Sequence, residues 1–491
     1  MTIKDLTPAI VWNNFYQLTR VPRPSKHEAQ VQAFLLDWAK AHKIEAMKDE
    51  IGNIIMKVPA TPGYEGKKGV ILQGHMDMVP QKNNDKVHDF EKDPIETWID
   101  GEWLKAKGTT LGADDGLGVA MALAVAESDT VKHGPVEILI TTDEETGMTG
   151  ARALKPGLLK GDILINLDSE TEGELYVGCA GGLDASATAK CRLRPEPKGY
   201  ECWSLAVKGC KGGHSGMDII LWRANANKQA ARIVYELLTK TDAKLIDFEG
   251  GTLRNAIPRE AFATLYVKNT KKAKALVAAL EKTIKAEYAA TDPDLNVVFE
   301  PYKCAEGETC DPQECLYVDK KAAVRLMQAV IACPDGVDRM SDAMPGLVET
   351  SNNLAMVSLY KGEFKVHTLM RGSVDSVKEF LSVKFRSVFE LAGCEVDFRG
   401  GYSGWAPNAA SPILGVMKKV YKGLFKKEPK VMAIHAGLEC GILAGAYPHW
   451  DMVSVGPTLM SPHSPDERAY IPSVTKVWDF LQAVLEAIPE K

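Results

Sequence analysis

The first 170 residues or so alternate between segments of helical periodicity and short apolar runs. Ser25 and Glu28 match the capping-box pattern that begins a helix, a serine followed three residues later by a glutamate. Apolar residues then recur at helical spacing and give this helix one apolar face: Val31, Phe34, Leu35 and Trp38. The pattern predicts an amphipathic helix capped by Ser25.

Four short runs of β-branched and aliphatic residues predict buried strands, and a segment dense in Ala, Met, Leu and Val predicts a helix between two of them. The predicted strands are Asn53–Val58, Gly69–Gln73, Val136–Thr142 and Ile163–Leu167, and the helix is Leu117–Glu127. Short apolar strands that alternate with helices are typical of a mostly parallel sheet covered on both faces. The first region is therefore predicted to be an α/β domain.

From about residue 186 the pattern changes to two similar blocks of helices and long strands. The first block contains helix Ala224–Thr239, strand Ala261–Val267 and helix Lys271–Ala289, and the second contains helix Val318–Cys333, strands Leu354–Leu359 and Lys365–Arg371, and helix Val374–Leu391. After about residue 399 the chain returns to helix Ser411–Phe425, strand Lys430–Ile434 and a closing helix Ser473–Ile488. We expect one α/β domain, residues 1–186 and 399–491, interrupted by an α+β domain of two related halves, residues 187–398.

The composition, 45% hydrophobic and 25% charged over 491 residues, is that of a globular protein with two or three domains. A net charge of −6 leaves no basic excess to neutralise a phosphate backbone, which counts against nucleic-acid binding. The N-terminus lacks the pattern of a signal peptide, and the longest apolar run, Val119–Ala126, is far shorter than the roughly 20 residues of a membrane helix. The ten cysteines, including Cys304, Cys310 and Cys315, fit no zinc template and are expected to be reduced. We expect a cytoplasmic protein that does not bind membranes.

Acidic residues and a histidine follow the predicted strands of the first region. They are His75 and Asp77 in GHMDMVP, Asp114 and Asp115 in GADDGLG, Glu144 and Glu145 in DEETG, and Asp168 in NLDSE. Taken singly, each pattern has an ordinary explanation as a turn, a helix cap or a solvated loop. Ligand sites in open α/β sheets lie beyond the carboxyl ends of the strands, so the order of these loops favours one shared site.

Carboxylates gathered at one edge repel each other by about 4 kcal/mol per pair at 4 Å and an effective dielectric of about 20. Either some of them hold protons or cations neutralise them. Carboxylates alone would suit magnesium or calcium, whereas His75 favours zinc, cobalt or manganese. His463, in the proline-bounded loop SPHSP, is the best candidate for a second histidine ligand.

The ordered motifs GHMDMVP, GADDGLG, DEETG, NLDSE and SPHSPDE resemble the aminoacylase/carnosinase clan of two-zinc peptidases. PRPSKHE, GCAGG, GGHSGMDI and HAGLECGIL resemble the dipeptidases within that clan, so the resemblance spans nearly the whole chain. It implies a zinc-exopeptidase-like catalytic domain, with the inserted domain as a lid. It also implies hydrolysis of dipeptides of broad sequence, including Xaa-His dipeptides such as carnosine.

The resemblance further implies two divalent cations per chain, most readily Zn²⁺, with Co²⁺ or Mn²⁺ as alternatives. Asp114 would bridge both cations. His75 and Asp168 would complete one site, and Glu145 and His463 the other.

Two further acids would then have catalytic roles. Asp77 would orient the His75 imidazole, and Glu144 would be the general base for a hydroxide that bridges the metals. The resemblance also implies that the peptide bond between Asp114 and Asp115 is cis.

Five residues are candidates for substrate contacts. The resemblance implies that His214, in GGHSG, stabilises the oxyanion and that Arg371 holds the substrate carboxylate. Asn255 is a weaker candidate for the same pocket, and His435 and Glu439 are candidates to contact the amino end of the substrate. Without a role in binding, His214 would be a surface histidine in a glycine-rich turn, and Arg371 would be a surface arginine on a strand.

The nearest alternative function is an N-acyl amino acid deacylase or amidase of the same clan. Its deacylases and carboxypeptidases tend to carry Glu where its dipeptidases carry Asp, so Asp168 favours a peptidase. Phosphoryl transfer is disfavoured because no G-x-x-x-x-G-K-[ST] motif occurs, and a binding protein without activity would be expected to lose the base or the ligands. The sequence leaves open the preferred dipeptide, the metal, and whether His214 acts in its own chain or from the partner chain of a homodimer.

Overall fold

The computed structural model describes residues 2–302 and 316–491, which form two compact units. Unit 1 consists of Met1–Cys179, Trp405–Ala433 and Leu438–Lys491, and unit 2 consists of Ala180–Gly404 and Ile434–Gly437. The cysteines at 304, 310 and 315 lie outside the described residues, and no disulfide bond links the cysteines inside them. No helix in this part of the chain is both long and apolar enough to span a bilayer.

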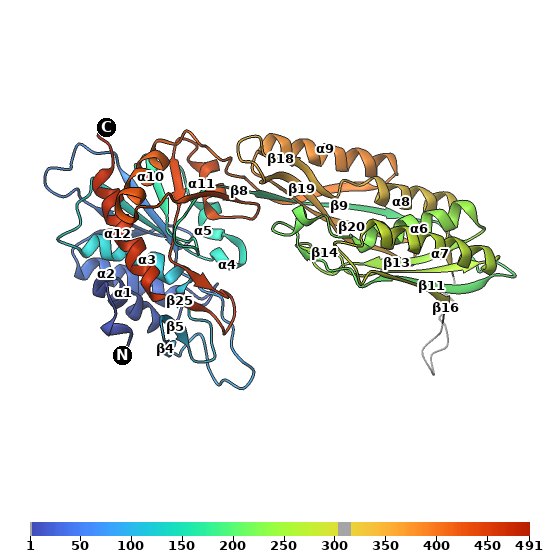
Figure 1. The fold of residues 1–491 in the computed structure, drawn as a ribbon, viewed down its shortest axis with the longest axis horizontal. Coiled ribbons are helices and arrows are strands. Elements are labelled where there is room, and N and C mark those ends of the chain that lie inside the picture. Colours follow the sequence, from blue (N-terminus) through green and yellow to red (C-terminus); the bar gives the residue numbers. More distant parts are fainter. Residues whose placement is uncertain (1, 303–315) are drawn as a thin grey trace. The chain divides into compact units, whose positions relative to one another are not determined.

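The sheet of unit 1 has eight strands and a parallel centre (Figure 1). Side chains on the central strands are almost all buried, as the uninterrupted apolar runs predicted. Antiparallel strands extend the sheet on both sides of the parallel group β6, β3, β7 and β23. In order across the sheet the strands are β1 (Glu45–Lys48), β2 (Ile54–Val58), β6 (Val136–Thr141), β3 (Val70–His75), β7 (Ile163–Asn166), β23 (Asp451–Ser454), β8 (Glu174–Cys179) and β22 (Lys430–Ile434). The predicted α/β fold with a mostly parallel sheet is confirmed.

Helices cover this sheet, and a small antiparallel sheet adjoins it. The helices are α1 (Ala9–Thr19), α2 (Ala29–Ala41), α3 (Ala113–Glu127), α4 (Glu144–Gly147), α5 (Thr149–Ala153), α10 (Pro412–Phe425), α11 (Glu439–Ala446) and α12 (Ile471–Ala487), preceded by the 3₁₀ turn η1 (Ile3–Asp5). The small sheet contains β24 (Leu459–Met460), β25 (Arg468–Tyr470), β5 (Trp103–Ala106) and β4 (Thr97–Asp100).

Helices α3 and α11 lie on opposite faces of β3. A Cβ at Gly74 would lie 3.6 Å from the side chain of Val119 in α3. The preceding residue, Gln73, donates a hydrogen bond of 2.6 Å to Glu439 in α11. Because successive side chains on a strand alternate between its faces, the two helices cover the sheet from both sides.

The prediction that Ser25 caps the first amphipathic helix is wrong. Helix α2 begins at Ala29, and Glu28 occupies the cap position. Residues 25–28 form a turn in which Glu28 accepts a 2.8 Å hydrogen bond from the Lys26 N–H, while the Ser25 hydroxyl donates to the Met78 carbonyl over 3.3 Å. The turn thus bonds to the loop after β3, and this long-range contact replaces the local cap.

Unit 2 contains a nine-stranded antiparallel sheet made of two halves with the same order of elements. Leaving short strands aside, the first half is β11 (Glu201–Lys208), α6 (Ala226–Lys240), β13 (Lys244–Gly250), β15 (Ala261–Val267), α7 (Thr270–Glu287) and β16 (Asn296–Pro301). The second half is β9 (Gly181–Lys190), α8 (Lys320–Ala332), β19 (Val348–Tyr360), β20 (Glu363–Gly372), α9 (Asp375–Leu391) and β21 (Glu395–Tyr402). The halves join where β13 pairs with β19, and the helices lie side by side over one face of the sheet (Figure 1).

Short elements complete unit 2. They are β10 (Leu193–Arg194), β17 (Tyr317–Val318), β12 (Gly213–His214), β14 (Ala256–Ile257), β18 (Gly336–Met340) and the 3₁₀ turn η2 (Ile219–Leu221). Helix α8 begins two residues later than predicted, because Val318 belongs to β17 and the Asp319 side chain caps the helix by accepting the Lys321 N–H. Strand β19 begins earlier than predicted, because the polar run Glu349–Asn353 is buried within it.

Candidate metal centre

The parallel strands of unit 1 place the candidate metal loops at one edge of its sheet. His75 is the last residue of β3 and pairs with the last residue of β6, whose following turn carries Glu145. The loop after β7, the other neighbour of β3, carries Asp168. Asp114 lies at the start of α3, and His463 lies in the connection between β24 and β25. The peptide bond between Asp114 and Asp115 is cis, as predicted.

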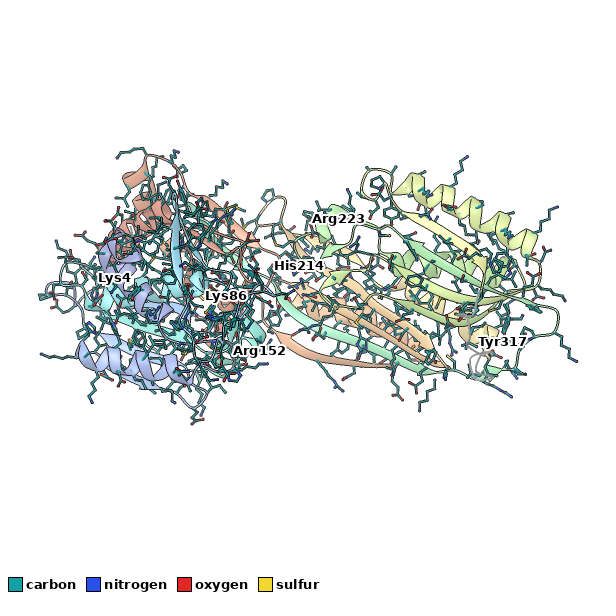
Figure 2. All side chains as sticks on the ribbon, turned by 90° about the horizontal axis from the view of Figure 1, so that it is seen from below. Lys4, Lys86, Arg152, His214, Arg223 and Tyr317 are labelled. Carbon is teal, nitrogen blue, oxygen red and sulfur yellow. The ribbon has the colours of Figure 1, made fainter. Side chains whose placement is uncertain are left out.

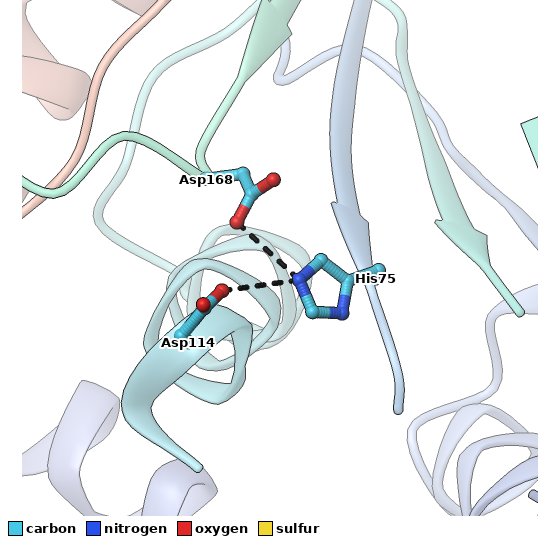
Figure 3. A group of neighbouring side chains, drawn as sticks. All are labelled: His75, Asp114 and Asp168. Carbon is cyan, nitrogen blue, oxygen red and sulfur yellow. Dashed lines mark hydrogen bonds and ion pairs between the residues drawn. The ribbon is translucent and has the colours of Figure 1, made fainter. Parts of the chain in front are cut away.

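The five candidate ligands form two groups. In the first, Nε2 of His75 lies 3.1 Å from Oδ1 of Asp114 and 3.4 Å from Oδ1 of Asp168 (Figure 3). In the second, Nε2 of His463 lies 3.1 Å from Oδ2 of Asp114 and 2.9 Å from Oε2 of Glu145. Within each group the three ligand atoms lie within 4.8 Å of one another. Asp114 therefore belongs to both groups, with one carboxylate oxygen in each.

This donor set fits a pair of divalent cations. Imidazole nitrogens mixed with carboxylate oxygens suit zinc, cobalt or manganese. Without a cation, the hydrogen bonds with Asp114 and Glu145 raise the pKa of His463 to about 11, so this imidazole would hold a proton between two carboxylates. Burial raises the pKa of Asp168 well above its ordinary value. A cation in each group would supply the positive charge that these ligands need.

Asp77 connects the His75 imidazole to the turn that carries Glu144. Its Oδ1 lies 3.4 Å from Nδ1 of His75 and accepts the Glu144 N–H over 3.0 Å. Its Oδ2 accepts the Glu145 N–H over 3.3 Å. Burial raises the pKa of Glu144 well above its ordinary value, and the charges of Glu439 and Glu145 raise it further. The two neighbouring glutamates therefore differ. Glu145 faces His463, whereas Glu144 is an acid that holds a proton more strongly than an exposed glutamate does.

Glu467 holds the backbone of the loop before α3 and was not identified from the sequence. Its Oε2 accepts the N–H groups of Leu111 over 2.7 Å and Gly112 over 3.0 Å. Its Oε1 accepts those of Ala113 over 2.7 Å and Asp114 over 3.3 Å. Glu467 follows the candidate histidine of the second group in the same connection, so one carboxylate joins the two loops that carry these ligands.

Arg23 holds the same loop from another side and was also missed. This side chain, only 2% exposed, donates through Nη1 to the carbonyl oxygens of Met76 over 3.0 Å and Asp77 over 3.1 Å, and through Nη2 to the carbonyl of Gly112. It therefore joins the loop after β3 to the loop before α3. Arg23 lies in PRPSKHE and Glu467 ends SPHSPDE, but residue type did not indicate their roles, because both bind main-chain groups, which every sequence supplies.

Glu439 lies inside unit 1, beside the carboxyl ends of β3 and β6. Its side chain is fully buried, and Oε2 accepts hydrogen bonds from Gln73 over 2.6 Å and Thr141 over 2.7 Å. Gln73 in turn accepts a 2.6 Å hydrogen bond from Asn166. This network joins β3, β6 and β7 at the edge from which the metal loops emerge. The expected contact of Glu439 with a substrate stays a prediction.

The candidate substrate residues of unit 2 surround Gly216 (His214 is labelled in Figure 2). A Cβ at Gly216 would lie 2.2 Å from the carbonyl oxygen of His435, 3.1 Å from the ring of His214 and 3.3 Å from Nε of Arg371. This close approach requires a glycine. The Asn255 carbonyl accepts the N–H of the residue before Gly216 over 2.9 Å, so all four candidates lie around the two-stranded sheet of β12 and β14.

The two histidines of this group are neutral at neutral pH. Burial lowers the pKa of His435 to about 3, and the charge of Arg371 contributes. Nε2 of His435 lies 2.7 Å from the Ser351 hydroxyl. Burial and the Arg371 charge also lower the pKa of His214. Among these side chains, Arg371 is the one with a positive charge to offer a carboxylate.

Comparison with known proteins confirms the resemblance drawn from the motifs. Residues 71–487 match the family described as peptidase family M20/M25/M40. The chain is 44% identical over 491 residues to the cytosol non-specific dipeptidase of Escherichia coli (strain K12), covering 100% of this chain and 99% of that protein. A crystal structure of aminoacylhistidine dipeptidase from Vibrio alginolyticus matches with a TM-score of 0.94 at 45% identity, covering 100% of this chain and 99% of that one. The aminopeptidase PepT from Bacillus cereus matches with a TM-score of 0.56 at 17% identity, covering 98% and 99%, which shows a shared fold.

We expect Glu467→Gln to weaken metal binding about 10- to 100-fold, the usual effect of losing a side chain that orients ligands. The glutamine amide offers one acceptor oxygen, so N–H groups of the loop before α3 lose their partner. Isothermal titration of the apoprotein with Zn²⁺ measures the change. Asp466→Asn, next to it in the chain and exposed, is the control. Wild-type affinity in Glu467→Gln would contradict the role of this carboxylate.

Proposed function

The chain belongs to peptidase family M20/M25/M40, and we propose that it is a metal-dependent dipeptidase of broad specificity whose substrates include Xaa-His dipeptides such as carnosine. The observation that carries the proposal is the position of Asp114, whose two oxygens each face a histidine that also lies beside another carboxylate. Unit 1 would be the catalytic domain, predicted as residues 1–186 and 399–491, and unit 2 the lid, predicted as 187–398. We propose that the protein acts in the cytoplasm.

The metal ligands would be His75, Asp114 and Asp168 in one group and Asp114, Glu145 and His463 in the other. The chemistry of the donors suits Zn²⁺, with Co²⁺ or Mn²⁺ as alternatives. When bound, such a pair lowers the pKa of a water molecule and polarises the carbonyl of the substrate.

Glu144 would be the general base. It would take a proton from the attacking water and deliver it to the leaving amine, which requires a carboxylate that can both accept and release a proton. Burial, which raises the pKa of Glu144, favours this role. Asp77 would fix the orientation of His75 and of the turn that carries Glu144, since it contacts both.

Unit 2 would supply the groups that recognise the substrate. We propose that Arg371 binds the free carboxylate, that His214 stabilises the oxyanion, and that Asn255 contributes to the same pocket. His435, which is neutral and bonded to Ser351, would position this group. The protein would form a homodimer, in which His214 would act either in the site of its own chain or in the site of the partner chain.

The second candidate function is deacylation of N-acyl amino acids. Asp168, which lies in the first metal group, favours the peptidase. We expect carnosine and α-dipeptides to be hydrolysed at least about 100-fold faster, as kcat/KM, than N-acetyl amino acids, a difference of about 2.7 kcal/mol in transition-state binding. Release of free amino acids measures both reactions under the same conditions. Faster hydrolysis of the N-acetyl amino acids would make the deacylase the correct function.

Glu144→Gln is expected to lower kcat about 10²- to 10⁴-fold while the metal content stays unchanged. Glu145→Gln is the matched contrast, because the neighbouring glutamate faces His463 and its loss should lower the metal content. Turnover of an α-dipeptide and elemental analysis of the purified variants separate the two effects. A Glu144→Gln variant with full kcat, or with as little metal as Glu145→Gln, would refute the assignment.

Arg371→Lys should raise the KM for free dipeptides about 10- to 100-fold, because lysine keeps the charge but loses the planar pair of donors. Dipeptides with an amidated C-terminus should change little, since they offer no carboxylate. Arg399→Lys, at an exposed arginine paired with Asp397, is the control. The same change of KM for free and amidated dipeptides would show that Arg371 does not bind the carboxylate.

A further inference from the structure

Tyr402, which has no role in the proposed function, lies in the same row of the unit 2 sheet as Arg371. In the middle strand β9, Gly182 pairs with Arg371 of β20 on one side and with Tyr402 of β21 on the other. Residues that pair directly across neighbouring strands project their side chains to the same face of a sheet. Arg371 and Tyr402 therefore flank Gly182 on one face, and these three residues form one row across three strands.

This row lies on the face of the sheet that is turned away from the helices of unit 2. Ala185 and Ala187 of β9 belong to the buried core that also contains Phe385 of α9. Because successive side chains alternate along a strand, Gly182 lies on the opposite face from these two alanines. The row is therefore outside the core, on the face where polar side chains can meet a ligand.

The glycine at position 182 leaves the room that the Tyr402 ring fills. A Cβ there would lie 2.8 Å from Cζ of Tyr402 and 2.9 Å from its hydroxyl oxygen, closer than a Cβ approaches other atoms. The phenol thus lies across the middle strand, with its hydroxyl on the side of Arg371. This hydroxyl accepts a hydrogen bond from the Arg371 guanidinium, which has donors only.

A buried lysine holds the backbone at Tyr402. Lys378 of α9, 5% exposed, donates to the Tyr402 carbonyl over 2.6 Å and to Asp375 over 2.8 Å. The same Asp375 oxygen accepts the Gly404 N–H over 3.0 Å. These bonds fix the end of β21, so the position of the phenol does not depend on a ligand.

The surroundings of Arg371 favour an anionic ligand. Asp184 of β9, whose charge acts on Arg371, is paired with Arg254. Arg371 itself is 6% exposed, and its Nε lies 3.4 Å from the hydroxyl of Ser215, a neutral group like the hydroxyl of Tyr402. A buried guanidinium beside neutral hydroxyls gains free energy from a carboxylate that binds it.

We propose that Tyr402 is a further substrate-binding residue, whose hydroxyl donates a hydrogen bond to the carboxylate that Arg371 binds. Since the hydroxyl oxygen accepts an N–H of Arg371, its own hydrogen points away from the guanidinium, and a carboxylate is a stronger acceptor than a neutral oxygen. A C-terminal amide would turn N–H groups toward these donors, so the pair would select a free C-terminus. This role of Tyr402 rests on the proposed function, because it concerns the carboxylate of a dipeptide.

Tyr402→Phe tests the role, because it removes the hydroxyl and keeps the ring over Gly182. We expect the KM for free α-dipeptides to rise about 10- to 100-fold, the usual effect of losing a hydrogen bond to a charged group, with kcat nearly unchanged. The KM for dipeptides with an amidated C-terminus should stay as in the wild type. Tyr200→Phe is the matched control, since it removes a hydroxyl that bonds to Asp242 over 2.9 Å elsewhere in unit 2.

The double variant Arg371→Lys/Tyr402→Phe separates a direct contact from an effect that acts through Arg371. If both side chains bind the carboxylate, the KM of the double variant should exceed that of Arg371→Lys at least about 5-fold. An equal KM in the two variants would show that Tyr402 only positions Arg371, and would overturn the proposal.

An unchanged KM for free dipeptides in Tyr402→Phe, or an equal rise for free and amidated dipeptides, would also overturn the proposal. The proposed function would still stand if Arg371→Lys distinguished the two kinds of substrate. A wild-type protein that hydrolyses no dipeptide would instead contradict the proposed function, and the role of Tyr402 with it. The thermal unfolding midpoint of each variant checks that its fold is intact.

Discussion

The repulsion among carboxylates at one edge of the unit 1 sheet is the constraint on which the rest of the structure depends. Asp114, Glu145 and Asp168 lie beside His75 and His463 within two groups that share Asp114. Buried like charges at such distances are tolerated only when protons or cations compensate them. A pair of divalent cations would compensate all of them at once, and it would make the same residues a hydrolytic centre.

The surrounding fold holds these ligands in place with main-chain and buried polar contacts. Glu467 and Arg23 both bind the loop before α3. Glu467 itself belongs to the connection that carries His463, and Arg23 also donates to the loop after β3. Below them, Glu439 and Gln73 join the central strands just before the ligands emerge. Such contacts would fix the positions of the candidate ligands before any metal binds, which is what a site with defined geometry needs.

The sequence was sufficient to predict the parallel α/β sheet and the five side chains that meet at its edge. Chemistry-bearing loops directly follow apolar strands, and the parallel register then brings those loops together. It was not sufficient for Arg23 and Glu467, because their partners are peptide groups that leave no trace in residue type. The prediction that Ser25 caps a helix was wrong for a related reason, because the Ser25 hydroxyl donates to the carbonyl of Met78, a residue far along the chain. In β19, the run Glu349–Asn353 reads as a polar loop, yet its side chains are buried in the sheet.

Metal stoichiometry tests the central claim most directly. The apoprotein titrated with Zn²⁺ should bind two ions per chain, and Asp114→Asn should weaken both binding events, because one oxygen of Asp114 lies in each group. Asp168→Asn should weaken one event and leave the other nearly unchanged. A wild-type protein that binds a single ion, or an Asp114→Asn variant that loses only one, would contradict the shared carboxylate at the centre of this account.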